Sequence, residues 1–242
     1  AMGAFGPGTL VVDTEAEAST NKIPAMPNRY DELEEALVEG IRGYMRKCGF
    51  KTAVLGLSGG IDSAVVAVLA AKAIGPENLT CITLPSRYSS EGSVRHSQEL
   101  CDNLGCPLKN ISIEKPFAAF LETLAPAFAG RESDLTEENL QARIRGDILM
   151  AWSNKFGAML LTTGNKSELA VGYCTLYGDM CGALAPIGDL LKTEVFALSE
   201  RMHERDGTMP RSIIDKPPSA ELRPNQLDQD SLPPYDKLDA IL

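Results

Sequence analysis

The sequence has few of the residues that build metal sites from imidazoles and paired thiols. It contains only two histidines, His96 and His203, and none of its six cysteines forms a Cys-x-x-Cys pair. Because zinc sites draw mainly on these residue types at close spacing, the sequence argues against bound zinc. We therefore expect reduced and mostly buried cysteines, as in a cytoplasmic protein. They stand at positions 48, 81, 101, 106, 174 and 181.

Long apolar runs and basic charge are also scarce. No stretch of about 18 uninterrupted apolar residues occurs, so no membrane-spanning helix is expected. No charged start leads into an apolar segment with a small-residue cleavage site, so no signal peptide is expected. The 23 Lys and Arg against 33 Asp and Glu leave a net charge of −10. Because phosphate backbones select basic faces, nucleic acid is not expected as a partner, and the sequence predicts a cytoplasmic protein.

The pattern of strands and helices predicts the fold class. The 242 residues, 44% of them hydrophobic, suffice for one sizeable core. Short strand patterns alternate with helical ones, which predicts an α/β fold whose parallel sheet carries helices on both faces. In such sheets, ligands bind beyond the carboxyl ends of the strands. The expected strands are 52–57, 79–84, 108–113 and 159–163, and the expected helices are 30–47, 62–74, 94–104, 117–124 and 137–155.

The two ends of the chain differ from this alternation. Glycine and proline punctuate residues 1–29, which we expect to be a linker with one strand-like stretch at Thr9–Val12. Residues 30–242 are expected to form a single domain. Five prolines lie among polar residues between Asp215 and Pro234, so this segment is irregular. It is either a disordered tail or a loop held in place by function.

The segment Leu55–Ser63 reads Leu-Gly-Leu-Ser-Gly-Gly-Ile-Asp-Ser and is the most informative in the chain. A strand runs into a Gly-Gly turn and then a helix, so backbone N–H groups can face an anion at a helix N-terminus. Ser58 and Ser63 add hydroxyl donors, and Asp62 puts a carboxylate where a phosphate-bound Mg²⁺ would lie. It is not a kinase-type P-loop, because no Gly-Lys-Ser/Thr ends it. The alternative is an ordinary tight strand-to-helix turn.

A second candidate site follows the last expected strand. Thr163 stands at the strand end, and Glu168 follows five residues later at a helix start, where it can serve as a second Mg²⁺ carboxylate opposite Asp62. Alternatively, Asn165 caps this helix and Glu168 completes a capping box, a contribution of about 1 kcal/mol. The two interpretations are compatible.

Further polar residues have weaker signals. Asn139 and Arg143 are four residues apart and share one helix face, which can bind a phosphate or a purine or can simply be solvated. Lys192 and Lys216 are single lysines near loops, for which solubility is the simple explanation.

Together, these segments resemble the NAD⁺ synthetases, members of the PP-loop ATP pyrophosphatases. The resemblance covers roughly residues 30–242 and rests on motifs in family order. They are Leu-Ser-Gly-Gly-Ile-Asp-Ser at 57–63, Pro-Ser-Arg-Tyr-Ser-Ser-Glu-Gly-Ser at 85–93, Glu-Asn-Leu-Gln-Ala-Arg at 138–143, Thr-Gly-Asn-Lys-Ser-Glu-Leu-Ala-Val-Gly-Tyr at 163–173, Tyr-Gly-Asp at 177–179, Lys-Pro-Pro-Ser-Ala-Glu-Leu-Arg-Pro-Asn-Gln at 216–226 and Asp-Ser-Leu-Pro-Pro-Tyr at 230–235.

The resemblance implies amidation of deamido-NAD⁺ to NAD⁺, with ATP as co-substrate and Mg²⁺ as cofactor. The nicotinate carboxylate attacks the α-phosphate of ATP, and ammonia then attacks the adenylate, releasing AMP. The ATP-binding positions would be Gly56, Leu57, Ser58, Gly59, Gly60, Ile61, Asp62, Ser63, Arg87, Thr163, Lys192 and Ser219. Asp62 and Lys192 would be catalytic, Asp62 and Glu168 would hold the metal, and Asn139, Arg143 and Glu168 would lie on the deamido-NAD⁺ side. The proline-rich segment would be an ordered loop over the site, and the assembly a homodimer or higher homo-oligomer.

Two departures refine the resemblance. Leu176 stands where compact ammonia-dependent enzymes carry a lysine, so the chain looks more like the synthetase domain of the glutamine-dependent form. Phe5–Asp13 resembles the closing strand of the glutaminase domain that precedes it there. We therefore expect a part of a longer enzyme, with an incomplete C-terminus, whose ammonia is free or comes from glutamine through a separate domain.

Three alternatives stay open at this point: a GMP synthetase-like or other PP-loop AMP-forming amidase, a tRNA-modifying thiolase, and a nucleotide-binding module without turnover. The acidity and the absence of paired cysteines count against the thiolase. The segments 138–143 and 216–226 count against the other amidases. A module without turnover would have no chemical need for both Asp62 and Glu168.

Overall fold

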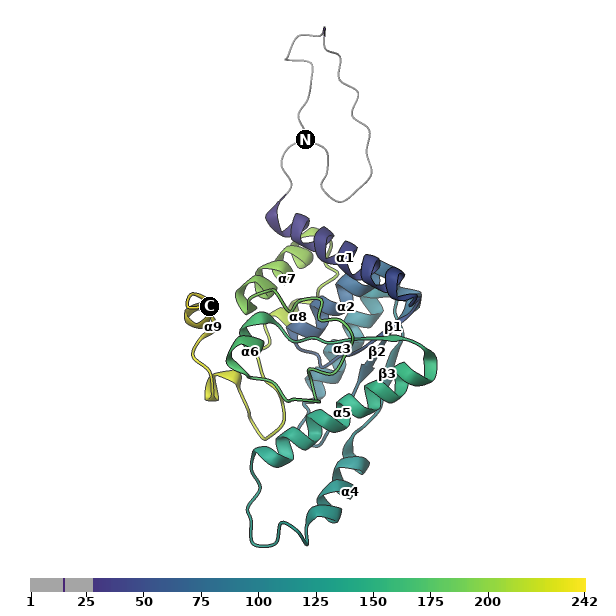
Figure 1. Ribbon diagram of the computed structural model, residues 1–242. Coiled ribbons are helices and arrows are strands. Elements are labelled where there is room, and N and C mark those ends of the chain that lie inside the picture. The colour runs from purple at the N-terminus through teal and green to yellow at the C-terminus, as the bar shows by residue number, and fades with distance from the viewer. Residues whose placement is uncertain (1–14, 16–27) are drawn as a thin grey trace.

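The computed structural model describes residue 15 and residues 28–242. A parallel sheet with strand order β3-β2-β1-β4 forms its centre, and helices cover both faces (Figure 1). This confirms the predicted α/β fold. The strands are β1 Ala53–Gly56, β2 Leu79–Thr83, β3 Leu108–Asn110 and β4 Met159–Leu161.

The helices agree with the expected ranges up to about residue 156. They are α1 Arg29–Cys48, α2 Ile61–Ile74, α3 Glu91–Leu104, α4 Glu114–Leu124, α5 Leu135–Phe156, α6 Lys166–Val171, α7 Lys192–Asp206, α8 Arg211–Ile214 and α9 Tyr235–Asp239, with short 3-10 turns at Pro76–Asn78 and Asp228–Asp230. Beyond residue 171 the sequence patterns did not predict α7, α8 or α9. Among the described helices, none is long and apolar enough to cross a lipid bilayer. The expected strand Thr9–Val12 and the segment Phe5–Asp13 lie outside the described residues.

Each expected strand is shorter in the structure, because its last residues leave the sheet and line the space above it. Leu57, for example, lies beyond β1 but still donates its N–H to the Ile82 carbonyl, at 2.8 Å. Thr162 lies beyond β4 and donates to the Leu184 carbonyl at 2.9 Å. The carboxyl ends of β1 and β4 are therefore neighbours, and the residues that follow them are brought to the same side of the molecule.

Two hydrophobic cores lie on opposite faces of the sheet, as its alternating side chains require. Ala53 and Leu55 of β1 point into the larger core, which α1, α2, α3 and α7 complete. Val54 points into the smaller core, with Ile144 of α5 and Phe117 of α4. The side chains of α2 are buried around almost its whole circumference, which explains its nearly uniform apolar sequence.

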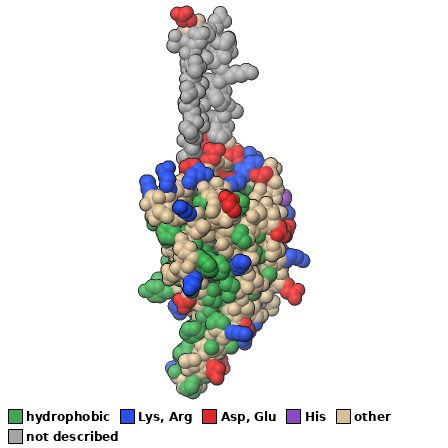
Figure 2. Space-filling view, turned by 90° about the vertical axis from the view of Figure 1, so that its right-hand side faces the viewer, with side chains coloured by type: hydrophobic (Ala, Val, Ile, Leu, Met, Phe, Trp, Pro, Cys, Tyr) green, Lys and Arg blue, Asp and Glu red, His purple; other side chains and the backbone are tan. Residues whose placement is uncertain are grey.

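Ion pairs attach α1 to α7 at one end of the molecule. Arg201 donates two hydrogen bonds to Asp31, at 2.9 and 2.7 Å, and Arg205 donates to Glu34 at 2.7 Å. Glu34 is buried and also pairs with Lys72 of α2. Figure 2 shows charged side chains gathered at this upper level and hydrophobic side chains at the middle and lower levels of the same face.

Replacing Glu34 by alanine is expected to destabilise the protein by roughly 2–3 kcal/mol, because it leaves two cations without their shared carboxylate. The cost stays below that of a fully buried pair, since the Arg205 and Lys72 side chains are 29% and 32% exposed. Urea unfolding measures the effect, with Glu35→Ala as the control because Glu35 is exposed on the same helix turn. Equal losses for the two variants would contradict the assigned role of Glu34.

Candidate active site

The loop between β1 and α2 is shaped by hydrogen bonds among its own residues. The Ser58 N–H donates to Ser63 Oγ at 3.2 Å, and the Ser63 hydroxyl donates to the Gly60 carbonyl at 3.0 Å. The Gly60 N–H donates to Ser58 Oγ at 3.2 Å. We call residues 57–60 the glycine loop. Ser58 and Ser63 hold the turn in shape at the N-terminus of α2, where the helix dipole and free N–H groups favour an anion.

Gly59 is required in this loop for two reasons. Its φ is +73°, a backbone conformation that side-chain-bearing residues rarely adopt. A Cβ atom at this position would also lie 2.7 Å from Ser93 Cα, and closer still to the Ser93 carbonyl oxygen. The glycine loop therefore packs directly against the first turn of α3.

A buried lysine joins two carboxylates beside the glycine loop. Lys192, the first residue of α7, has a side chain that is only 2% exposed. Its Nζ donates to Asp62 Oδ2 at 2.5 Å and to Glu168 Oε1 at 3.1 Å. Asn165, fully buried, donates from Nδ2 to Asp62 Oδ1 at 2.8 Å. The first turns of three helices, α2, α6 and α7, thus meet at one ammonium group.

The capping interpretation of Glu168 also holds. Asn165 Oδ1 accepts the Glu168 N–H at 3.0 Å, and the Glu168 carboxylate accepts the Asn165 N–H at 3.5 Å. Because the second oxygen of Glu168 reaches Lys192, one side chain both caps α6 and faces Asp62. The sequence had assigned Asn165 only as a cap, whereas its amide also orients Asp62.

The electrostatics of this group are unusual. Burial alone would lower the pKa of Lys192, but the carboxylates of Asp62 and Glu168 raise it overall, so the ammonium stays charged. Burial, followed by the nearby charge of Asp62, raises the pKa of Glu168 to about 7. Behind Lys192, the Tyr235 hydroxyl donates to Asp228 Oδ2 at 2.8 Å, and burial raises the pKa of Asp228. The group formed by Lys192, Asp62, Glu168 and Asp228 therefore contains more carboxylates than cations.

The raised pKa of Glu168 predicts a pH-dependent stability. The unfolded value is near 4.5, so the folded protein holds this proton more tightly, and the resulting stabilisation is complete below about pH 4.5. It is lost as pH rises through about 7. We expect the free energy of unfolding of the metal-free protein to fall by roughly 2 kcal/mol through this group between about pH 5 and 8. Urea unfolding in EDTA at several pH values measures the slope, which Glu168→Gln should flatten. An unchanged slope in that variant would assign the effect to another group.

A cleft with a volume of about 270 Å³ unites most of the predicted site residues. Asp62, Glu168 and Lys192 line it, and so do Thr163 and Ser219. The neighbouring walls come from the strand ends and from residues 216–222. Of the segment 56–63, the lining residues are Gly56, Leu57, Ser58, Gly60, Ile61, Asp62 and Ser63, while Gly59 does not line the cleft and packs against Ser93.

Besides Gly59, three predicted site residues do not line this cleft. Arg87 donates from Nε to Glu114 Oε1 at 2.9 Å and covers the ring of Phe117. Asn139 Oδ1 accepts the Thr175 hydroxyl at 2.8 Å, and Arg143 Nε donates to the Leu176 carbonyl at 3.2 Å. Asn139 and Arg143 thus hold the turn that leads to Asp179, which lines the cleft. Their assignment to substrates stays a prediction.

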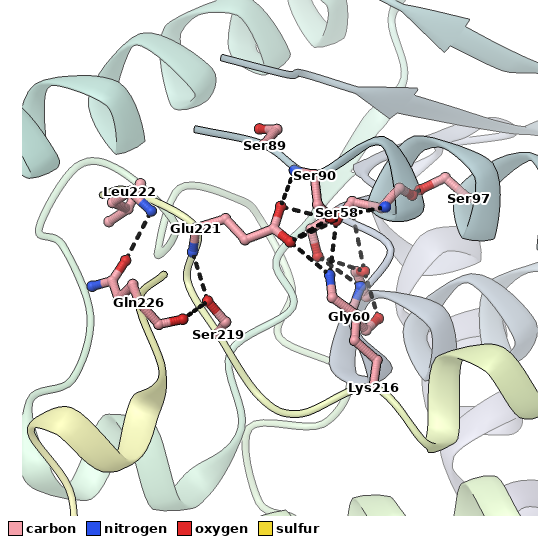
Figure 3. Close-up of polar contacts among 12 residues, drawn as sticks. Ser58, Gly60, Ser89, Ser90, Ser97, Lys216, Ser219, Glu221, Leu222 and Gln226 are labelled. Atoms are coloured by element: carbon pink, nitrogen blue, oxygen red, sulfur yellow. Dashed lines mark hydrogen bonds and ion pairs between the residues drawn. The ribbon is translucent and has the colours of Figure 1, made fainter. Parts of the chain in front are cut away.

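The C-terminal loop, residues 215–234, lies over the cleft and is attached on both sides. The Glu221 carboxylate accepts the Ser93 hydroxyl at 2.7 Å and the Ser90 hydroxyl at 2.9 Å, and it pairs with Lys216 Nζ at 3.0 Å. Gln141 of α5 donates to the Leu222 carbonyl at 2.9 Å. Figure 3 shows Glu221 reaching toward the start of α3, with Ser58 of the glycine loop close by. The expected ordered loop is confirmed, and Lys216 is part of the site rather than a solubilising residue.

Further residues line the cleft that the sequence patterns did not indicate. Arg145 donates from Nε to the Leu84 carbonyl at 3.0 Å, and burial lowers its pKa to about 10. It is two residues after Arg143, on the helix side that packs against the sheet, a placement that helical periodicity could have indicated. Asp228 comes from the loop, where no periodicity applies.

The donor set fits a magnesium ion. Mg²⁺ takes oxygen ligands, commonly one or two carboxylates together with substrate phosphates. Asp62 and Glu168 present carboxylate oxygens to the same ammonium group at the edge of the cleft. An additional cation would also relieve the repulsion from Asp62 that, after burial, raises the pKa of Glu168.

Comparison with known proteins gives consistent results. A sequence model of the family described as NAD synthase matches residues 33–242. The glutamine-dependent NAD(+) synthetase of Rhodobacter capsulatus is 53% identical over 258 residues, which cover 100% of this chain and 46% of that protein. The corresponding protein of Thermotoga maritima is 53% identical over 219 residues, covering 90% of this chain and 38% of the relative. The chain thus spans less than half the length of these curated relatives.

Two solved structures share the fold. The glutamine-dependent NAD+ synthetase from Acinetobacter baumannii, in complex with ADP, has a TM-score of 0.78 and 40% identity, covering 93% of this chain and 42% of that chain. The NMN synthetase from Francisella tularensis has a TM-score of 0.81 and 30% identity, covering 89% of this chain and 86% of that chain.

Proposed function

The chain belongs to the NAD synthase family, and we propose on that basis that it forms NAD⁺ from deamido-NAD⁺, ATP and ammonia. The observation that carries the proposal is the cleft in which the glycine loop, two carboxylates and a buried lysine meet. A cradle for phosphates next to a group of fixed charges suits AMP transfer, where catalysis consists mainly of positioning and charge stabilisation.

The proposed reaction has two steps. A carboxylate oxygen of the nicotinate forms a bond to the α-phosphorus of ATP, and the bond to the pyrophosphate oxygen breaks. Ammonia then attacks the carbonyl carbon of the adenylate, AMP leaves, and one proton passes to solvent. The first step is needed because a free carboxylate has no good leaving group for an amine to displace.

The chain's own residues supply the positioning. The N–H groups of the glycine loop and the start of α2 would hold the phosphates, with the Ser58 and Ser63 hydroxyls shaping the loop. Lys192 is kept charged by its two carboxylates, so it is placed to balance negative charge that develops on the phosphates. Thr163 and Ser219 also line the cleft and would contact ATP.

Asp62 and Glu168 would hold Mg²⁺, which would act as a Lewis acid toward phosphate oxygens. We further propose that Arg87 lies near the adenine. Glu168, Asn139 and Arg143 would serve the deamido-NAD⁺ side, the latter two by fixing the turn that carries Asp179.

The broader assignments are proposals as well. Residues 30–242 would act as the synthetase domain and residues 1–29 as a linker. The relatives named glutamine-dependent support ammonia delivery from glutamine by a separate domain. A cytoplasmic homodimer or larger homo-oligomer is the arrangement that the family resemblance implies.

The experiment that tests the function offers the purified chain Mg-ATP with deamido-NAD⁺, and ammonium chloride or glutamine in separate reactions. We expect AMP, pyrophosphate and NAD⁺ in equal amounts with ammonium. A parallel reaction with nicotinate mononucleotide tests the activity in the name of the Francisella tularensis neighbour; the higher identity to NAD(+) synthetases favours the dinucleotide. AMP formation only with the mononucleotide would overturn the substrate assignment, and no AMP with either would overturn the enzymatic one.

A further inference from the structure

Three cysteines from different segments of the chain meet in the larger hydrophobic core. Cys81 lies in the middle of β2, Cys101 in the last turn of α3, and Cys106 just after that helix. Their Sγ atoms all lie within 4.8 Å of one another, and those of Cys81 and Cys106 are 3.9 Å apart. All three are free thiols. Spacing alone did not reveal this group, because its members come from three separate segments.

The backbone holds the three thiols in place. The Cys106 N–H donates to the Cys101 carbonyl at 3.1 Å, and the Cys81 N–H donates to the Pro107 carbonyl at 3.1 Å. Each ligand segment is thus fixed to a neighbour before anything binds. Such preorganisation reduces the entropy cost of closing a three-ligand site.

The sulfur spacing fits a single central atom. Three sulfurs that each lie about 2.3 Å from a common centre are roughly 3.5–4 Å apart, depending on whether the centre is pyramidal or planar. The observed 3.9 Å falls in this range, and the remaining separations need only small side-chain rotations. In the described part of the chain, no fourth Cys, His, Asp or Glu joins the group. The three cysteines therefore offer too few ligands for an ion such as Zn²⁺, which prefers four.

The net charge of the bound complex decides which metal or metalloid the site favours. Cys81 and Cys101 are 0% and 1% exposed and belong to an apolar core, and Cys106 is 7% exposed at its edge. A buried net charge costs several kcal/mol. Three thiolates leave a charge of about −2 around Cu⁺ and −1 around Zn²⁺, but none around a trivalent centre.

We propose that Cys81, Cys101 and Cys106 form a binding site for a trivalent thiophilic metalloid, with arsenite as its probe. Binding is a condensation, As(OH)₃ + 3 RSH → As(SR)₃ + 3 H₂O. Three As–O and three S–H bonds break, three As–S and three O–H bonds form, and neither arsenic nor sulfur changes oxidation state. The ligand would enter past Cys106, which has the largest exposed fraction of the three cysteines, and it would tie β2 to α3.

The test uses a variant that carries Cys48→Ala, Cys174→Ala and Cys181→Ala, so that only the three clustered thiols remain. After incubation with arsenite, we expect native mass spectrometry to show one arsenic gained for three hydrogens lost. Thiol titration should find no free thiol, and X-ray absorption at the arsenic edge should show three sulfur neighbours. Circular dichroism establishes that the protein stays folded.

Adding Cys101→Ala, or Cys106→Ser at the edge of the core, leaves two thiols and should weaken binding at least about tenfold. Three free thiols in a folded protein after prolonged incubation with excess arsenite would overturn the proposal. So would equal affinity of the two-thiol variants, or tighter binding of Zn²⁺ or Cu⁺ than of arsenite in parallel titrations.

Discussion

Replacing Lys192 by methionine is expected to lower kcat/KM for NAD⁺ formation by about 10²–10³-fold, the usual effect of removing one fixed charge or donor from a reaction site. The Lys192 side chain is 2% exposed and its ammonium group contacts both Asp62 and Glu168, so methionine keeps the volume but removes the cation between them. Removal of one partner from a buried ion pair commonly costs about 3–5 kcal/mol. The metal-free variant should therefore also unfold at a lower temperature.

The pH dependence identifies the cause of this loss. Without Lys192, the pKa of Glu168 should rise above its value of about 7, so lowering the pH from about 9 to about 7 should protonate this carboxyl group and recover part of the lost stability. Calorimetry in EDTA at two pH values measures this recovery. Lys166→Met is the matched control, because Lys166 is exposed on α6 and should affect neither activity nor stability appreciably. A pH-independent deficit would show that packing, rather than charge, explains the role of Lys192.

Replacing Gly59 by alanine is expected to have the second large effect, through geometry instead of charge. The new methyl group would overlap the backbone of Ser93, and neither the loop nor α3 can yield without moving the N–H groups beside the cleft. Displacement of a binding loop by about 1 Å commonly costs about 10²-fold in rate. We expect a loss of at least this size in kcat/KM, with a raised KM for ATP.

Gly207→Ala separates steric overlap from backbone strain. Gly207 ends α7 with a φ of +69°, but no atom lies within 4 Å of its virtual Cβ. This variant should lose only about 1 kcal/mol of stability and keep its activity. Steady-state kinetics and urea unfolding of both variants distinguish the two effects. Comparable kinetics for Gly59→Ala and wild type would contradict the close packing of the glycine loop on α3.

The central part of the fold was predictable from the sequence because local patterns and burial agree there. The apolar residues of α2 and of the strands beside it occupy buried positions. Their hydrophobicity in the sequence is therefore sufficient to predict these elements. The prediction missed α7 although Val195, Leu198 and Met202 recur at helical spacing, since Ser199 interrupts the apolar stripe. The helices α8 and α9 are too short to develop a period, and tertiary contacts stabilise them.

The candidate site was predictable only where its residues are contiguous. The segment 56–63 and the pair Asn165 and Glu168 carry their chemistry in local order. In contrast, Arg145 and Glu221 reach the cleft from distant elements, and no spacing rule relates them to the glycine loop. The same holds for the three clustered cysteines. Such juxtapositions follow from the topology of the fold, which the local patterns of a single sequence do not reveal.

The strand order has a consequence for the kinetics of folding. Val54 of β1 pairs with Thr80 of β2 but also with Leu160 of β4, which is 160 − 54 = 106 residues away in the chain. Closing a loop of that length costs conformational entropy before the contacts between β1 and β4 can form and offset the cost. We expect β1, β2 and β3 to associate first, and the docking of β4 to set the slow phase of refolding. Because Asn165, Glu168 and Lys192 follow β4, the cleft forms only in that last step.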